Sequence, residues 1–106
     1  MLTPAPYYGM YPVEDMIPPV SINDNMQNSP YANSNSRTKR PEYADPDLIK
    51  YMISEYYGII TEIDDYVGLI LDKLDDLEIA DNTMIIFTSD HGEMLGAHGM
   101  RGKFNF

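Results

Sequence analysis

The apolar residues in the second half of the chain follow a helical period. From Ile49 to Leu74 they recur three and four positions apart, which places them on one face of a helix. Asp45 suits the N-cap and Pro46 suits the first helical position. We therefore expect a helix over about 46–77, on the order of 45 to 50 Å long at 1.5 Å per residue. Its apolar stripe consists of Ile49, Met52, Ile53, Tyr56, Ile60, Ile63, Val67, Ile70, Leu71 and Leu74.

The opposite face of this helix is acidic, and we expect it to contact water. Neighbouring acids such as Asp64 and Asp65 do not indicate acid/base chemistry, because adjacent residues on a helix diverge by about 100°. The acidic face consists of Glu55, Glu62, Asp65, Asp72 and Asp75.

A short apolar run follows the helix after a turn at 78–82. Residues 83–88 contain Met-Ile-Ile-Phe without polar alternation, which predicts a strand buried on both faces. A helix feeding such a strand is half of a βαβ unit, so the sequence predicts the α/β class. A lone strand leaves both of its backbone edges unpaired. We therefore expect a truncated or partial sequence, and the ending at 104–106 without a closing helix agrees with this.

The first part of the chain, residues 1–44, has no sustained periodicity. It holds seven of the eight prolines and many Asn and Ser residues. Proline fixes φ and removes a backbone donor, so regular elements should be short there. We expect an irregular connection over 1–44, followed by a packed region over 45–106.

Composition excludes some partners. Seven Lys and Arg face 17 Asp and Glu, a formal net charge of -10, and nucleic acid is excluded as a partner because phosphate binding requires a positive face. The one basic run, residues 37–40, is interpreted as a solvated surface patch. The chain has no cysteine, which excludes disulfides and leaves its compartment open. We expect no membrane segment, because the apolar stretches are far shorter than the ~20 residues that span a bilayer.

The loop over 89–103 carries the candidate chemistry. Asp90 and His91 follow the predicted strand, at the end where α/β sheets present ligands. Carboxylate oxygen and imidazole nitrogen both bind metal ions. Lys103, thirteen positions after Asp90, offers a cation for an anionic group beside the metal. Such a set suits a tetrahedral oxyanion ester.

The residues alone leave a plainer interpretation open. Asp90 would cap a helix beginning near Gly92, and His91 and His98 would be ordinary polar groups of a loop. The Asp-His-Gly triplet by itself does not decide between the two, because many loops contain it by chance.

The longer pattern resembles a known family. Ser89-Asp90-His91-Gly92, Leu95-Gly96-Ala97-His98-Gly99 and Lys103 are similar to the late metal-binding motif of the sulfatases, in the alkaline-phosphatase-like superfamily. The pattern resembles most the iduronate-sulfatase-like and phosphonate-monoester-hydrolase-like members. This resemblance implies an alkaline-phosphatase-like sandwich with a mostly parallel sheet. Residues 45–106 would then be part of its catalytic domain, and 1–44 a substrate-side loop.

The resemblance also implies roles for single residues. Asp90 and His91 would bind the metal, and Lys103 would contact a sulfate or phosphate-like oxygen in substrate binding and catalysis. His98 would act near the leaving group, although a simple bond to loop backbone is the alternative. Arg101 is either a substrate clamp or a solvated side chain. Ca²⁺ is the family default, while the nitrogen of His91 suits Mn²⁺ or Zn²⁺ at least as well.

The implied activity is hydrolysis of a sulfate ester of a small molecule or carbohydrate. In the sulfatases the nucleophile is a formylglycine made from a Cys-x-Pro-x-Arg or Ser-x-Pro-x-Arg motif, and this chain has neither. We therefore expect the nucleophile outside this chain, the remainder of the catalytic domain as a partner, and no activity from these residues alone. A phosphodiesterase or phosphonate monoester hydrolase is the close alternative. A noncatalytic binding module that uses the proline- and tyrosine-rich arm is the distant one.

Overall fold

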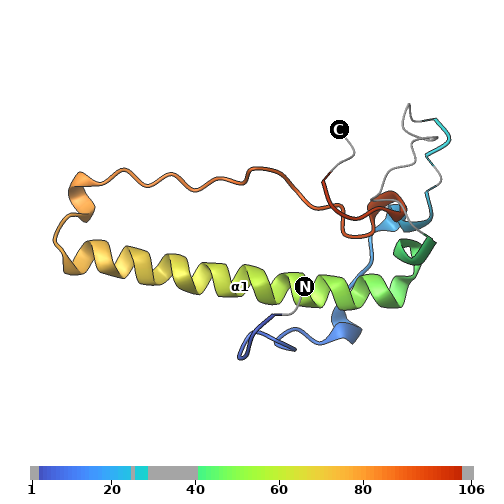
Figure 1. Ribbon diagram of the computed structural model, residues 1–106, viewed down its shortest axis with the longest axis horizontal. Coiled ribbons are helices and arrows are strands. Elements are labelled where there is room, and N and C mark those ends of the chain that lie inside the picture. The colour runs from blue at the N-terminus through green and yellow to red at the C-terminus, as the bar shows by residue number, and fades with distance from the viewer. Residues whose placement is uncertain (1–2, 25, 29–40, 104–106) are drawn as a thin grey trace.

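One long helix dominates the computed structural model, which describes residues 3–24, 26–28 and 41–103 (Figure 1). The helix, α1, is Pro46–Asp76, where we expected a helix over about 46–77. Asp45 caps it, because its Oδ1 accepts a hydrogen bond from Asp47 N at 3.0 Å. The basic run at 37–40 lies outside the described residues. Short 3-10 helices in the described part are η1 (Val13–Asp15), η2 (Val20–Asn23), η3 (Pro41–Ala44), η4 (Ala80–Asn82) and η5 (Ala97–Gly99).

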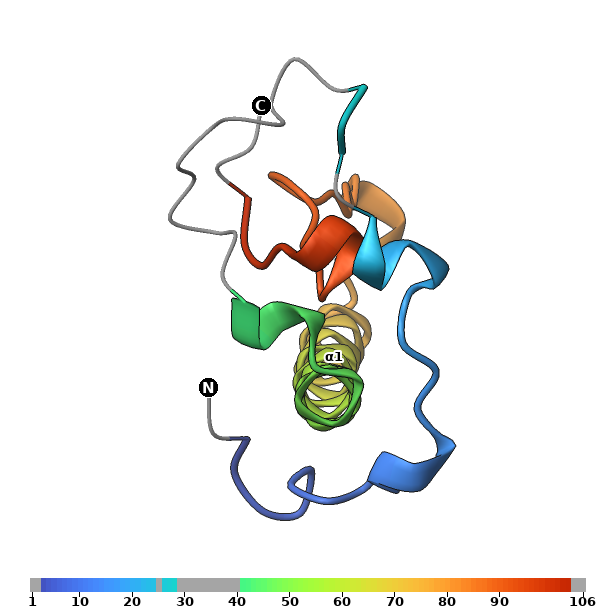
Figure 2. The ribbon, with the colours of Figure 1, turned by 90° about the vertical axis from the view of Figure 1, so that its right-hand side faces the viewer.

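The N-terminal arm, residues 3–24, wraps around α1. Viewed along the helix, it passes under α1 and up one side until η2 lies against the C-terminal loop (Figure 2). Ser54 Oγ donates to Tyr11 O at 2.6 Å, and the Tyr11 and Thr61 hydroxyls are 2.6 Å apart. These hydrogen bonds come from different turns of α1 and hold the arm along the helix.

Two acidic residues of α1 also hold this arm. Thr3 Oγ1 donates to Glu55 Oε2 at 2.9 Å, and Glu55 is only 6% exposed. The expectation that Glu55 contacts water is therefore wrong, because the arm covers it and supplies donors to its carboxylate. Tyr7 OH donates to Asp65 Oδ2 at 2.9 Å. This bond is the main cause that raises the pKa of the Tyr7 phenol, since the carboxylate stabilises the protonated form.

The core lies at the N-terminal end of α1. Ile49 and Ile53 pack there with Met16 and Ile22 of the arm. Farther along, the predicted apolar stripe is open, with Ile63 50% and Ile70 61% exposed. In this chain the arm and the loop cover only the first turns of the stripe. Within the described residues, no helix combines the length and apolar character needed to cross a membrane.

The predicted buried strand over 83–88 does not form in this structure. The segment is extended and runs back along α1 (Figure 1), with no strand pairing between the described residues. Its side chains are open to water, with Met84 86% and Phe87 80% exposed. A strand needs a neighbouring strand to pair its backbone groups, and the described residues supply none.

Two glycines of α1 provide a matched test of this packing. A Cβ on Gly58 would lie 2.7 Å from Tyr7 O, whereas a Cβ on Gly68 would meet nothing within 4 Å. We expect Gly68→Ala to raise the free energy of unfolding by about 0.5 to 1 kcal/mol through helix propensity. Gly58→Ala should lower it by about 1 to 3 kcal/mol, because the arm must shift. Urea unfolding followed by circular dichroism measures both, and equal stabilisation by the two variants would contradict this packing.

Candidate metal and anion site

The loop between Glu93 and Gly102 is folded on itself. Gly96 N donates to Met100 O at 2.8 Å, and η5 forms the tip between them. Gly96 has φ +89°, and a Cβ there would lie 2.8 Å from side-chain atoms of Ile49, which is fully buried. A glycine is required at this position both by the left-handed backbone and by the close approach to α1. The loop is thus anchored to the core.

Asp90, His91 and Lys103 come together at the base of this loop. His91 Nε2 lies 3.2 Å from Asp90 Oδ2 and 2.6 Å from Lys103 Nζ. The side chains of His91 and Asp90 are 40% and 81% exposed, so the cluster faces outward. Ser89 Oγ donates to His91 O at 2.6 Å and holds the backbone turn between them.

The hydrogen bonds of His91 define its tautomer. Nδ1 lies 2.9 Å from Gly92 O, which can only accept, so Nδ1 carries the proton. Lys103 Nζ can only donate, so Nε2 presents its lone pair. The approach of Asp90 Oδ2 to Nε2 is therefore not a salt bridge, which would need a doubly protonated ring. It places two lone-pair donors side by side.

This donor pair would suit a divalent cation if Lys103 Nζ, which bonds to the Nε2 lone pair here, turned aside. Two ligands at about 2.3 Å from one ion and at right angles are about 3.3 Å apart, close to the observed separation. A backbone carbonyl on Nδ1 is also the usual way to orient a metal-binding histidine. Asp90 and His91 would supply only part of a coordination shell. No group of three or more His, Cys, Asp or Glu suited to a metal ion occurs among the residues that the structure describes.

His98 bonds to the N-terminal arm and not to the cluster of Asp90, His91 and Lys103. Its Nδ1 is 2.8 Å from Asp24 Oδ2, which links the loop tip to the N-terminal arm. The bond to loop backbone that the sequence left open for His98 is replaced by this side-chain pair. The contact between η2 and η5 places the two residues together.

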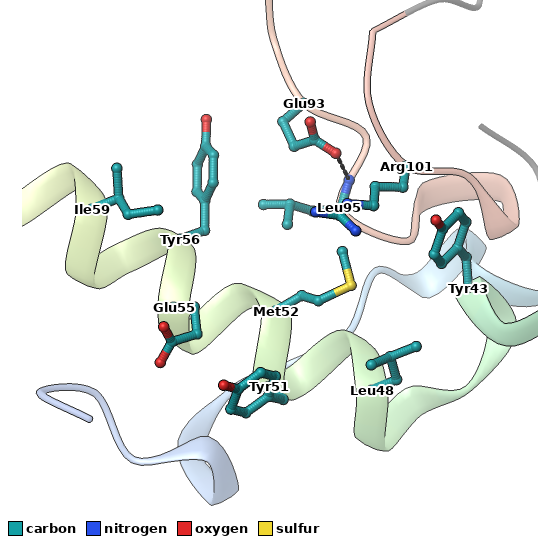
Figure 3. Close-up of a pocket in the computed structure, with 10 residues that line it drawn as sticks. All are labelled: Tyr43, Leu48, Tyr51, Met52, Glu55, Tyr56, Ile59, Glu93, Leu95 and Arg101. Carbon is teal, nitrogen blue, oxygen red and sulfur yellow. Dashed lines mark hydrogen bonds between the residues drawn. The ribbon is translucent and has the colours of Figure 1, made fainter. Parts of the chain in front are cut away.

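Arg101 extends into a pocket between the loop and α1 (Figure 3). The pocket has a volume of about 240 Å³, and Arg101 points toward Leu95 and Met52 within it. Tyr43 and Tyr56 line the same pocket. Arg101 is half-buried, so of the two interpretations left open, a fully solvated side chain does not describe it.

Sequence reasoning missed Glu93 and Asp24. The Glu93 carboxylate accepts from backbone amides within the loop, and Asp24 holds His98 from 74 positions away. Nothing in the pattern around Glu93 marks it, because its partners are backbone amides, which every residue type except proline offers. Asp24 has no sequence signal either, since its contact exists only once the arm has wrapped around the helix.

Comparison with known proteins decides the family. The sulfatase family model matches residues 15–105, nearly the whole chain. This chain belongs to the sulfatase family. The resemblance based on the motif is thereby confirmed at the level of the family, which implies an alkaline-phosphatase-like α/β fold, the class expected from the sequence. No solved structure matches the chain significantly.

Several characterised proteins are similar to this sulfatase-family chain. It is 35% identical to the multifunctional alkaline phosphatase superfamily protein PehA of Trinickia caryophylli, over 96% of the chain and 23% of that protein. It is 34% identical to the iduronate 2-sulfatase of Mus musculus, over 98% of the chain and 18% of that enzyme. The arylsulfatase of Clostridium perfringens is 32% identical, over 90% of the chain and 20% of that enzyme. The chain thus spans about a fifth of the length of these relatives.

Proposed function

We propose that the complete protein to which this sulfatase-family chain belongs is a metal-dependent sulfatase that hydrolyses a sulfate ester of a small molecule or carbohydrate. One observation carries the proposal: His91 Nε2 lies within 3.2 Å of Asp90 Oδ2 and within 2.6 Å of Lys103 Nζ. A pair of metal ligands beside an ammonium group is suited to an ester of a tetrahedral anion. The sulfatase names of two of the relatives above support the choice of sulfate.

In this proposal each residue of the cluster has a separate task. Asp90 and His91 hold the cation, which would supply Lewis-acid polarisation of a sulfate oxygen. Ca²⁺ is the default, and the nitrogen of His91 suits Mn²⁺ or Zn²⁺ equally. Lys103 holds a nonbridging oxygen and offsets the charge of the transferred group. In this role Lys103 would turn from His91 Nε2 to the anion, because the Nε2 lone pair cannot hold the cation and the ammonium group together.

The remaining roles extend the same proposal. His98 acts near the leaving group, and its bond to Asp24 would orient the ring. Arg101 contacts the substrate from the pocket between the loop and α1. The formylglycine nucleophile and the other metal ligands come from outside this chain, which has neither a Cys-x-Pro-x-Arg nor a Ser-x-Pro-x-Arg motif. These residues alone would therefore be inactive.

The rest of the catalytic domain is the proposed partner of the open apolar surfaces. Segment 83–88 would become a strand of a mostly parallel sheet once neighbouring strands pair with both of its edges. Its exposed side chains, such as Ile86 at 78%, and the open stripe of α1 would then be buried together. Burial of such surface is favourable by about 25 cal/mol per Å².

A phosphodiester or a phosphonate monoester is the second candidate substrate. PehA belongs to the alkaline phosphatase superfamily by its name, and this chain is 35% identical to it. Phosphodiesters and phosphonate monoesters carry one negative charge near neutral pH, as sulfate monoesters do. The single ammonium group of Lys103 in the described cluster therefore suits either candidate.

A substrate comparison tests the proposed function. The complete protein, loaded with Ca²⁺ or Mn²⁺, would be assayed with 4-nitrophenyl sulfate, bis(4-nitrophenyl) phosphate and a 4-nitrophenyl phosphonate. We expect the largest kcat/KM for the sulfate and loss of activity with a chelator, restored by adding the metal. A larger kcat/KM for either phosphorus ester would select the second candidate. No turnover of any of the three would refute both.

A further inference from the structure

The carboxylate of Glu93 joins the two ends of the loop between His91 and Lys103. We call this junction, where Glu93 meets Gly102, the neck of the loop. Glu93 Oε1 accepts a hydrogen bond from Gly102 N at 2.5 Å and a longer one from Leu95 N at 3.4 Å. Glu93 is half-buried, and it lines the pocket next to this neck (Figure 3). Hydrogen bonds from backbone amides to a carboxylate are among the stronger ones, because the acceptor is charged.

The neck determines whether the side chain of Lys103 can reach His91. His91 and Lys103 are 12 positions apart in sequence, a stretch that could span up to about 40 Å if extended. The backbone bond from Gly96 to Met100 closes only the tip of the loop. Among the described residues, the bond from Gly102 N to Glu93 Oε1 joins the backbone of one end of the loop to the side chain of the other. Lys103 follows directly, and its Nζ reaches His91 Nε2 at 2.6 Å.

We propose that Glu93 is a positioning residue, which holds Lys103 beside His91 by binding the amide of Gly102. The catalytic part of this inference rests on the proposed function, in which Lys103 binds the anion next to the metal ligands. The Glu93 oxygen that reaches the neck accepts from the backbone amides of Gly102 and Leu95, so Glu93 acts on Lys103 through the backbone. Gly102 has φ +83°, a conformation natural to glycine that sets the path of the backbone from this amide to Lys103.

The first test measures the hydrogen bond itself and needs no enzymatic activity. Amide hydrogen exchange at Gly102 would be followed by NMR in the complete protein with ¹⁵N-labelled glycine. We expect slow exchange in the wild type and in Glu93→Gln, whose amide oxygen still accepts. In Glu93→Ala the exchange should be faster by about tenfold or more. Gly96, bonded to Met100 O, is the internal reference and should stay protected, which shows that the loop tip remains folded.

The second test measures the position of Lys103 through its function. We expect Glu93→Ala to lower kcat/KM for 4-nitrophenyl sulfate by about 10- to 100-fold, and to weaken inhibition by inorganic sulfate similarly. Glu93→Gln should recover most of both. Bound metal, measured by elemental analysis, should not change, because Asp90 and His91 precede the neck. Glu14→Ala, at an exposed position in η1, removes a carboxylate elsewhere and should leave all values unchanged.

The outcomes separate the two proposals. Unchanged exchange at Gly102 in Glu93→Ala would refute the inference, whether or not the protein turns over sulfate esters. Unchanged kcat/KM in that variant, or a Glu93→Gln variant as impaired as Glu93→Ala, would also refute it. A wild-type protein without sulfate-ester turnover would refute the proposed function, and the exchange at Gly102 would then decide the role of Glu93 by itself.

Discussion

Replacing Lys103 by alanine in the complete enzyme should lower kcat/KM for a sulfate ester by about 100- to 1,000-fold, the usual effect of removing one preorganised donor to a developing negative charge. Lys103 Nζ lies 2.6 Å from His91 Nε2, so its charge is held next to the proposed metal ligands. A fixed ammonium group in that place stabilises nonbridging oxygens without reorganisation during the reaction. Steady-state kinetics with 4-nitrophenyl sulfate measures the effect.

Two further variants test whether the loss of kcat/KM depends on the position of the ammonium group or only on its charge. Lys103→Arg keeps the charge but replaces a compact ammonium with a planar guanidinium, so it should restore only a part of kcat/KM. Lys73→Ala is the matched control, because Lys73 lies on exposed α1 surface, 3.6 Å from Asp76 Oδ2. It should leave kcat/KM unchanged. Equal losses for Lys73→Ala and Lys103→Ala would show that only overall charge matters and would remove Lys103 from the site.

Replacing Asp90 by alanine should release the metal and lower kcat/KM by about 100- to 10,000-fold. The range corresponds to the several kcal/mol of charge stabilisation that a bound cation supplies. Asp90 Oδ2 lies 3.2 Å from His91 Nε2, a spacing that suits two ligands of one ion. Because His91 and the ligands from outside this chain remain, high metal concentration should restore part of the activity. Elemental analysis after dialysis and kinetics at increasing metal concentration measure both effects.

An acidic residue elsewhere is the control for this prediction. Asp72 is exposed on α1, and Asp72→Ala should change neither the bound metal nor kcat/KM. An Asp90→Ala enzyme that retains its metal and its turnover would show that Asp90 is an ordinary loop acid. Asp90 and His91 would then be ordinary polar groups of a loop in this chain.

Local patterns predicted α1 well because they act within a few residues. Asp45 and Pro46 form the helix start through contacts inside the first turn, and the apolar period marks the face that packs. The same reasoning failed for Glu55 and for segment 83–88. A covering arm 52 positions away buries Glu55, and a strand requires partners that the described residues do not contain. Both failures concern contacts between distant parts of a chain, about which a local period carries no information.

By itself the sequence determined the family, the long helix and the residues of the Asp-His-Gly motif, since all of these follow from residue order and short-range spacing. Only the tertiary structure decided that His91 presents its lone pair between Asp90 and Lys103, that Asp24 holds His98, and that Glu93 closes the neck of the loop. The physical reason is that each of these contacts depends on the path of the backbone between its partners. Loop closure by Gly96 against Ile49 and by Glu93 at Gly102 sets that path.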